Sequence, residues 1–159
     1  MKHLPKHLRP RWRYLAVVLE GRPDADFDRD QFQRHLWYSA QNLLGDRGSA
    51  ELDLSVVRFN FADGDGDAVV RTRRGAESES RAAIACIDRI DDQPVGLRIS
   101  GISGTIRACE EKYMGRGRED TEQRHVVFGN ADRRATVRGS RVDLPTDGAF
   151  TGATILDCE

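Results

Sequence analysis

The first third of the chain alternates between two hydrophobic patterns. The run WRYLAVVLE (12–20) is largely apolar on both faces, which is typical of a central strand in a sheet. Apolar residues then recur every three or four positions between Phe32 and Leu44, which is the spacing of one helical face. Asp28 can cap this predicted helix and Gly45 can end it.

The middle of the chain continues with three further strands and a second helix. ELDLSVVRFNF (51–61) and AVVRTRR (68–74) predict two strands, which the turn sequence ADGDGD (62–67) joins as a hairpin. A helix over 77–90 and a strand over 95–102 follow. The order β-α-β-β-α-β predicts an α+β, ferredoxin-like or RRM-like sandwich, with a four-stranded antiparallel sheet and both helices on one face.

These elements divide the chain into three parts. Residues 1–11 contain two prolines and no periodicity, so they predict a mobile basic arm. The ferredoxin-like domain spans 12–114 and ends in a short third helix. Residues 115–159 form a C-terminal extension, in which the sequence allows a β-hairpin that pairs 126–128 with 136–142.

Charge is distributed unevenly along the chain, although its net value is −1. Residues 1–13 carry five cations and no acid, while aspartates collect in 24–30, 63–67 and 88–92. Nearly all the cations are arginine, and this Asp-rich, Lys-poor composition resembles that of proteins from salt-loving archaea. A GC-rich genome would favour arginine over lysine as well. Compared with the acidic proteins of such organisms, a chain with a net charge close to zero would be relatively basic.

Hydrophobic segments and cysteine spacing bear on the location and the redox chemistry of the chain. No apolar run approaches the roughly 20 residues that a membrane-spanning helix needs, and the basic N-terminus lacks the apolar segment of a signal peptide. A cytoplasmic protein without a membrane partner is therefore expected. Cys86, Cys109 and Cys158 are too far apart for a zinc ribbon or a disulfide framework, and the first two fall in predicted helices as small hydrophobes.

The candidate catalytic and metal motifs are incomplete. Asp63-Gly64-Asp65-Gly66-Asp67 begins like a calcium loop, but Ala68 stands where that loop needs glycine and Arg74 where it needs glutamate. A polar hairpin turn is the better interpretation. The histidines have no third ligand nearby, and neither a nucleophile elbow nor a phosphate-binding glycine loop occurs. The sequence predicts no catalytic residue and no metal ligand on this chain.

Arginines are the most prominent polar residues of the predicted sheet. An RNA-recognition motif carries stacking aromatics on its third strand, and AVVRTRR (68–74) has none. The strands carry Arg71, Arg73 and Arg98 instead, and guanidinium groups can pair with phosphates or stack on bases. A solvated, salt-bridged sheet edge explains these arginines equally well.

The stretch ISGISGTIRACEEKYM (99–114) leads from the fourth strand into the third helix. Ser103 or Thr105 can cap that helix, and Gly104 allows close approach of the backbone. The free N–H groups at a helix N-terminus suit a phosphate. The helix adds two cations, Arg107 and Lys112. An ordinary capped turn is the alternative interpretation.

Two motifs taken together resemble a known family. The first motif, LRPRWRYLAVVLEG (8–21), leads into the first strand, and the second, RISGISGTIRACEEKYM (98–114), leaves the fourth. In this order they resemble protein component 2 of archaeal ribonuclease P, which has a eukaryotic counterpart in the ribonuclease P and MRP particles. The resemblance covers roughly residues 8–114.

The resemblance implies a protein subunit that helps the catalytic RNA of ribonuclease P remove the 5′ leader of precursor tRNA. In that family the RNA carries out the hydrolysis with bound Mg²⁺, so this chain would bind no cofactor of its own. Its partners would be the ribonuclease P RNA, precursor tRNA, the TIM-barrel-type protein component 3 and the other protein subunits.

Both motifs supply candidate RNA contacts under this resemblance. The first supplies Arg9, Arg11 and Arg13, and the second supplies Ser103, Gly104, Thr105 and Arg107. Residue analysis adds Arg71, Arg73, Arg98 and Lys112. The two-sided first strand would face the paired protein subunit through Tyr14, Ala16 and Val18, because exposed apolar surface usually marks an interface.

Two other functions stay open on the sequence alone. A ferredoxin-like module that binds a protein or a small ligand would show no dependence on RNA. A stand-alone nuclease would use Asp63–Asp67 with a metal ion and would cleave RNA by itself. A glycine-spaced turn is a poor frame for a two-metal site, which weighs against the nuclease.

Overall fold

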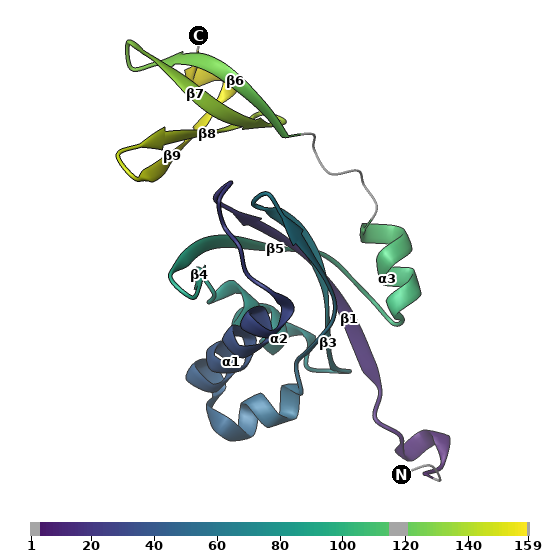
Figure 1. Ribbon diagram of the computed structural model, residues 1–159. Helices are drawn as coiled ribbons and strands as arrows, with labels where there is room; N and C mark the ends of the chain where they lie inside the picture. The colour runs from purple at the N-terminus through teal and green to yellow at the C-terminus, as the bar shows by residue number, and fades with distance from the viewer. Residues whose placement is uncertain (1–3, 115–120, 159) are drawn as a thin grey trace.

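The computed structural model describes residues 4–114 and 121–158 and contains two antiparallel sheets (Figure 1). The main sheet has the strand order β2-β3-β1-β5-β4, and the C-terminal sheet has the order β6-β7-β8-β9. The strands of the main sheet are β1 (Trp12–Gly21), β2 (Ser55–Ala62), β3 (Asp65–Arg73), β4 (Arg89–Ile90) and β5 (Gln93–Ser103). The helices are α1 (Arg29–Leu52), α2 (Glu77–Ala85) and α3 (Ile106–Tyr113).

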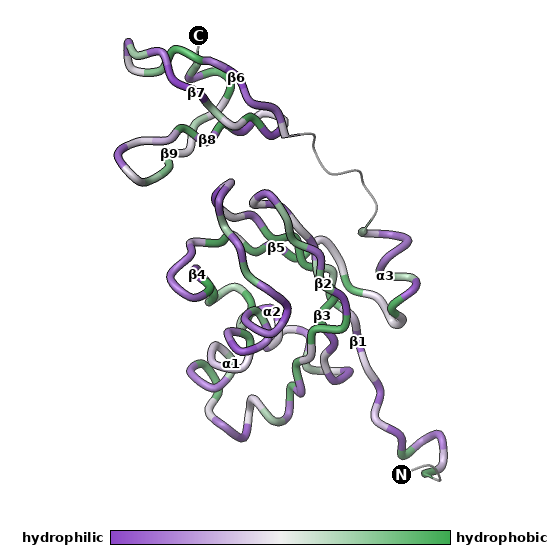
Figure 2. Tube along the Cα trace, in the orientation of Figure 1, coloured by the Kyte–Doolittle hydropathy of each residue, from purple (hydrophilic) through white to green (hydrophobic). Residues whose placement is uncertain are grey.

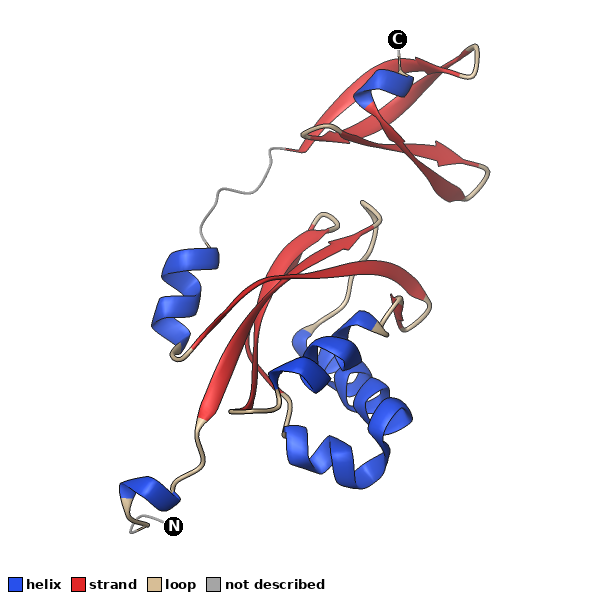
Figure 3. Cartoon of the chain, turned by 180° about the vertical axis from the view of Figure 1, so that it is seen from behind, coloured by secondary structure: helices blue, strands red, loops and turns tan. Residues whose placement is uncertain are grey.

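The α+β class, the antiparallel sheet and the first two helices on one of its faces are confirmed, but the predicted four strands are five, because the short β4 precedes β5 after the second helix. β1 lies between β3 and β5, and both of these neighbours run antiparallel to it. α1 and α2 pack on one face of the main sheet, while α3 lies on the other face (Figure 3). The middle parts of β1 and β3 are hydrophobic, whereas the ends of these strands and the arm that leads into β1 are mostly hydrophilic (Figure 2).

The main core lies between the sheet and the first two helices. Leu15, Val17 and Leu19 alternate along β1 and point into it, because successive side chains of a strand face opposite ways. Phe32 of α1 and Ile84 of α2 meet them and are 0% and 1% exposed. Each such side chain contributes about 1.5–3 kcal/mol when it is buried.

α1 begins as predicted and ends later than predicted. Asp28 accepts a hydrogen bond from the backbone of Gln31, whose side chain accepts one from the backbone of Asp28, which is a complete capping box. The helix is interrupted by a kink at Gly45 (φ 73°), but helical conformation resumes and continues to Leu52. Leu52 is buried, and its carbonyl accepts a hydrogen bond from Thr72, so the second segment is held by packing and the next strand starts only at Ser55.

The second helix is shorter than the predicted 77–90. α2 ends at Ala85, and β4 follows with a two-residue turn into β5. Asp91 and Asp92 make this turn with φ values of 44° and 65°, which aspartate tolerates better than most residues. Ile90 is fully buried, so its apolar character reflects a strand in the core and not a helical face.

The aspartate-rich segment 62–67 is a hairpin turn, as predicted. Asp63 and Gly64 have φ values of 55° and 76° and connect β2 to β3. A side chain at Gly64 would collide with the carbonyl oxygen of Arg22, so this glycine is required by space as well as by conformation. Within residues 4–114 and 121–158, no group of three or more His, Cys, Asp or Glu side chains could hold a metal ion.

The C-terminal extension is a four-stranded sheet, which corrects the predicted hairpin. Its strands are β6 (Thr121–Phe128), β7 (Ala131–Arg138), β8 (Arg141–Thr146) and β9 (Ala149–Thr154), followed by the 3-10 turn Ile155–Asp157. Val126 pairs with Arg133 across a turn at Gly129 and Asn130, and the predicted second strand in fact spans the turn between β7 and β8. The Asn130 and Gly139 turns fix this register.

One arginine joins the C-terminal sheet to the main sheet. The guanidinium of Arg138 donates hydrogen bonds to the carbonyls of Gly64 (2.6 Å) and Gly21 (2.9 Å), and it pairs with Asp143 (2.6 Å). Its side chain is only 7% exposed. Arg141 forms a second ion pair across the junction, with Glu20. The C-terminal sheet therefore caps the end of the main sheet that carries the β2–β3 turn (Figure 1).

α3 covers apolar residues that the sequence assigned to a partner protein. Ala16 (1% exposed), Val69 and the partly buried Tyr14 lie beneath it and pack with Cys109, the buried residue of α3. Ala16 is therefore buried by the chain's own helix and offers no surface to a partner, whereas Tyr14 stays partly exposed. Val18 lies further along the same strand face and remains partly exposed.

Cys109 should resist thiol reagents in the folded protein. It lies on the side of α3 that packs on the sheet and is fully buried, and burial raises the pKa of its thiol to about 11, whereas Cys86 is exposed. At pH 8 a maleimide should modify Cys86 and leave Cys109 intact, as read by peptide mass spectrometry.

The same burial predicts the direction of the pH dependence. The thiol of the unfolded chain ionises near pH 9, before that of the folded chain, so this contribution to stability is present below pH 9 and is lost as the pH rises towards 11. Modification of Cys109 as fast as that of Cys86 would contradict the packing of α3.

No helix in the described part of the chain is both long and apolar enough to cross a membrane.

Candidate nucleic-acid interface

Three segments bring arginines to one end of the main sheet. Trp12 is opposite Arg73 in the register of β1 and β3, and Tyr14 is opposite Arg71 on one side and Ser103 on the other. The start of β1, the end of β3 and the β5–α3 junction are therefore neighbours. We call this surface the basic end; its arginines are Arg9, Arg11, Arg13, Arg71, Arg73, Arg74 and Arg107. It lies opposite the end that the C-terminal sheet caps (Figure 1).

Carboxylates neutralise only part of the basic end. Three arginines have one acidic partner each, through the pairs Arg13–Glu77 (3.4 Å), Arg73–Asp53 (3.3 Å) and Arg107–Glu111 (2.7 Å). All three pairs are substantially exposed, so each contributes at most about 1 kcal/mol to stability and can open for another anion.

The remaining arginines of the basic end have no ion-pair partner among the described residues; they are Arg9, Arg11, Arg71 and Arg74. The surface thus keeps an excess of positive charge in a chain whose net charge is −1. This excess favours an anionic partner over the alternative of a fully salt-bridged sheet edge.

Trp12 is a site residue that the sequence analysis missed. Its ring lies 3.9 Å from the guanidinium carbon of Arg71 and 4.7 Å from that of Arg73. Stacking aromatics were expected on the third strand, whereas this aromatic lies on the first. The available signal was the alternation of β1 and β3, which places Trp12, Arg71 and Arg73 on one face once the two strands are paired.

The second motif adopts the predicted turn with one change of roles. Thr105, not Ser103, caps α3 by accepting a hydrogen bond from the backbone of Ala108 (3.1 Å). Ser103 is buried, and its hydroxyl has no hydrogen-bond partner within the described structure. Gly104 is exposed, and a Cβ atom there would lie 2.8 Å from a terminal nitrogen of Arg13. The two motifs are therefore in contact.

Two predicted RNA contacts lie outside the basic end. Arg98 is opposite Val18 on β5, several residues along the strand from Ser103. Lys112 is in the last turn of α3, away from the capped N-terminus. Both side chains are exposed, but neither shares the surface that the other predicted residues form.

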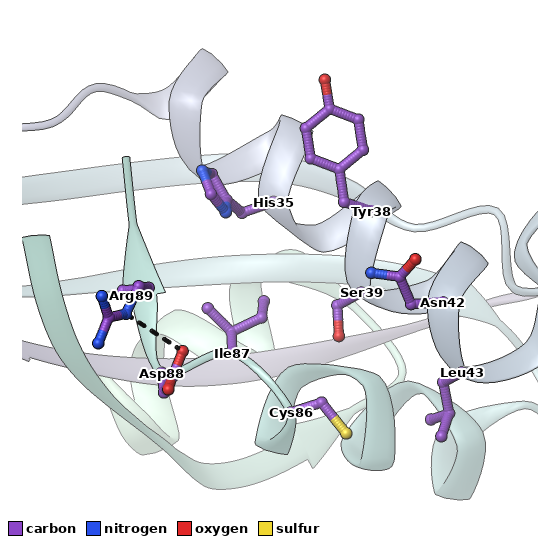
Figure 4. Close-up of a pocket in the computed structure, with 9 residues that line it drawn as sticks. All are labelled: His35, Tyr38, Ser39, Asn42, Leu43, Cys86, Ile87, Asp88 and Arg89. Atoms are coloured by element: carbon purple, nitrogen blue, oxygen red, sulfur yellow. Dashed lines mark ion pairs between the residues drawn. The ribbon is translucent and has the colours of Figure 1, made fainter. Parts of the chain in front are cut away.

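A shallow cavity of about 360 Å³ lies between α1 and the segment that joins α2 to β4 (Figure 4). Most of its polar side chains are already engaged: Ser39 donates to the carbonyl of Ala83, His35 pairs with Asp91, and Arg89 pairs with Asp88. Of the lining residues, Tyr38 and Asn42 are the polar side chains left. Few polar groups remain to orient a small ligand, which weighs against the small-molecule version of the interaction-module alternative.

The fold and the basic end define a small α+β protein whose charged surface suits an anionic partner. The sequence model of the Rpp14/Pop5 family matches residues 13–114, and the chain belongs to this family. The match ends where α3 ends, so the C-terminal sheet lies outside it.

Several relatives carry the name ribonuclease P protein component 2. The protein from Haloarcula marismortui is 63% identical over 99% of both chains, and that from Halorubrum lacusprofundi is 55% identical over the full length of both. The protein from Methanosarcina barkeri is 32% identical over 72% of this chain and 80% of its own length. A chain in the cryo-EM structure of yeast ribonuclease MRP is similar over 60% of this chain and 75% of its own, with 16% identity and a TM-score of 0.46.

Proposed function

We propose that this chain is a protein subunit of ribonuclease P and assists the catalytic RNA in removing the 5′ leader of precursor tRNA. The observation that carries the proposal is the similarity to ribonuclease P protein component 2 of Haloarcula marismortui over 99% of both chains. The basic end supports it, because phosphates of an RNA are the anions that its unneutralised arginines can bind.

The chain's own residues would bind and orient the RNA and leave the chemistry to it. Arg9, Arg11, Arg13 and Arg107 contact phosphates, and the backbone at Gly104 allows close approach. The Mg²⁺ ions that the hydrolysis requires belong to the RNA in this proposal. We infer that the particle acts in the cytoplasm.

A second surface is assigned to the protein partner, the TIM-barrel-type component 3. The sequence assigned this role to Tyr14, Ala16 and Val18, two of which α3 covers. Large apolar side chains are instead exposed on α1; they are Trp37, Tyr38, Leu43 and Leu44, between 36% and 54% exposed. Aromatic side chains of this kind are typical anchors of protein interfaces, so α1 is the better candidate.

Reconstituted cleavage of precursor tRNA tests the function. The cognate ribonuclease P RNA and component 3 are assayed at high salt and limiting Mg²⁺, with and without this chain. Addition of the chain is expected to lower the Mg²⁺ requirement and to yield the mature 5′ end. If the chain has no effect while the other components are active, the result would favour the alternative that it is an interaction module without a role in RNA processing.

Gly104→Val is expected to impair assembly with the RNA more than folding. Gly104 is exposed and does not adopt a positive φ, and the only atom that a Cβ would crowd is the end of the flexible Arg13 side chain. The thermal midpoint should therefore change little, while Arg13 is pushed aside and RNA affinity falls several-fold. Thermal unfolding and RNA titration of the same preparation separate the two effects. A large drop in the midpoint, with affinity following it, would make the junction purely structural.

A further inference from the structure

Trp12, Arg71 and Arg73 form a stacked cluster on the open part of the main sheet. They belong to paired residues at the ends of β1 and β3, and α3 covers the same face only from Tyr14 onwards. All three side chains are partly exposed. A guanidinium that lies over an indole ring is held by the ring's electrons and keeps its N–H groups free in its own plane.

The cluster has more positive charge than its surroundings neutralise. Asp53 pairs with Arg73 at 3.3 Å, whereas Arg71 has neither an ion pair nor a hydrogen bond to another described residue. The Nε atom of Arg71 is buried without a partner. The two guanidinium groups beside one ring repel each other, and Asp53 is the only carboxylate that pairs with them among the described residues. A second anion bound next to Arg71 would therefore stabilise the cluster.

Resting on the proposed function, we propose that Trp12, Arg71 and Arg73 bind an unpaired nucleotide of the ribonuclease P RNA. The base stacks on the Trp12–Arg71 pair, and the adjoining phosphate accepts hydrogen bonds from the two arginines. Trp12 is thus both a stacking surface and the positioning residue for Arg71.

The chemistry of the cluster favours a nucleotide over an acidic protein segment. A carboxylate would pair with the arginines but would not cover the partly exposed stack of Trp12 and Arg71. A nucleotide supplies both a charged group and a flat ring within a few ångströms of each other. Double-stranded RNA offers no free base face, so the occupant is expected in a loop, a bulge or a single strand.

The test labels this chain alone with 5-fluorotryptophan and assembles it with unlabelled RNA and component 3. The chain has two tryptophans, so two ¹⁹F resonances report on Trp12 and on Trp37, which lies on α1 with its indole N–H bonded to the carbonyl of Leu54. Adding the RNA is expected to shift the Trp12 resonance. Trp37 belongs to the surface assigned to component 3, so component 3 is added before the RNA. The later addition of RNA should leave the Trp37 resonance in place, which makes it the control for the RNA step.

Affinity measurements on variants complete the test. Trp12→Leu is expected to weaken RNA binding about ten-fold with little change in thermal stability, because it removes one stacked base. Trp12→Tyr keeps an aromatic ring and should retain most of the affinity. The double variant Trp12→Leu, Arg71→Gln should lose less binding free energy for RNA than the sum of the losses in the two single variants, because Trp12 positions Arg71.

Each remaining outcome has a definite meaning. If the wild-type chain stimulates cleavage but the Trp12 resonance does not move and Trp12→Leu binds normally, the nucleotide site is refuted while the proposed function stands. If component 3 alone moves the resonance, a protein occupies the site and the inference is refuted. If the wild-type chain neither binds the RNA nor stimulates cleavage, the proposed function fails and the inference fails with it.

Discussion

Replacement of Arg138 with methionine is expected to release the C-terminal sheet from the main sheet. The substitution leaves the Asp143 carboxylate, whose side chain is 20% exposed, without its partner, and it removes both hydrogen bonds to the carbonyls of Gly21 and Gly64. Loss of one member of a buried ion pair typically costs about 3–5 kcal/mol. Small-angle scattering should show a larger radius of gyration, and urea should unfold the two sheets in separate steps.

Arg134→Met is the matched control for this prediction. Arg134 lies on the same strand, is exposed, and makes no ion pair with any described residue. Its loss should change stability by no more than about 0.5 kcal/mol and leave the scattering unchanged. Identical scattering from Arg138→Met and the wild type would show that other contacts hold the junction. Because Arg138 is so little exposed, salt should weaken the junction only slightly.

The triple variant Arg11→Gln, Arg71→Gln and Arg74→Gln is expected to lose RNA affinity by about a thousand-fold or more. These arginines lack carboxylate partners within the described structure, so their removal breaks no internal ion pair. A hydrogen bond between charged groups contributes about 1.5 kcal/mol or more, and three such contacts are removed. The slope of log affinity against log salt should also fall by about two to three.

A second triple variant controls for net charge. Arg22, Arg98 and Arg134 lie away from the basic end, the first of them beside the β2–β3 turn, and glutamine at all three positions removes the same charge. This variant should bind RNA within a few-fold of the wild type. If both triple variants lose the same amount of RNA affinity, the total charge of the chain attracts the RNA and the basic end has no special role. The control also tests Arg98, which the sequence had grouped with the RNA contacts.

Local patterns in the sequence determined most of the main domain. The two-sided apolar run 12–20 became the central strand β1, and Asp28 caps α1 because its side chain reaches a backbone N–H only three residues away. The turn at Asp63 and Gly64 needs residues that accept positive φ, and the sequence supplies them. Signals of this kind act within a few residues, so they can be recognised without knowledge of the fold.

Tertiary packing decided where several elements end. The helix after Asp28 continues past Gly45 because Leu52 is buried in the core. The carbonyl of Leu52 also accepts a hydrogen bond from the hydroxyl of Thr72, which is 20 residues away in the chain. Ile90 has the spacing of a helical face yet lies in a strand, because the tight turn at Asp91 and Asp92 folds it back onto β5. In both places a contact between distant residues outweighed the local propensity.

The sequence by itself determined which residues are available for function: the arginines of both motifs, the Ser-Gly-Thr turn and the family they resemble. Only the tertiary structure decided which of them act together. Strand pairing sets Trp12 beside Arg71 and Arg73 and separates them from Arg98, and α3 buries Ala16. Arg138 reaches Gly64 across 74 residues and Gly21 across 117. Periodicity gives the face on which a side chain lies, but only the closing of long chain segments into one sheet determines its neighbours.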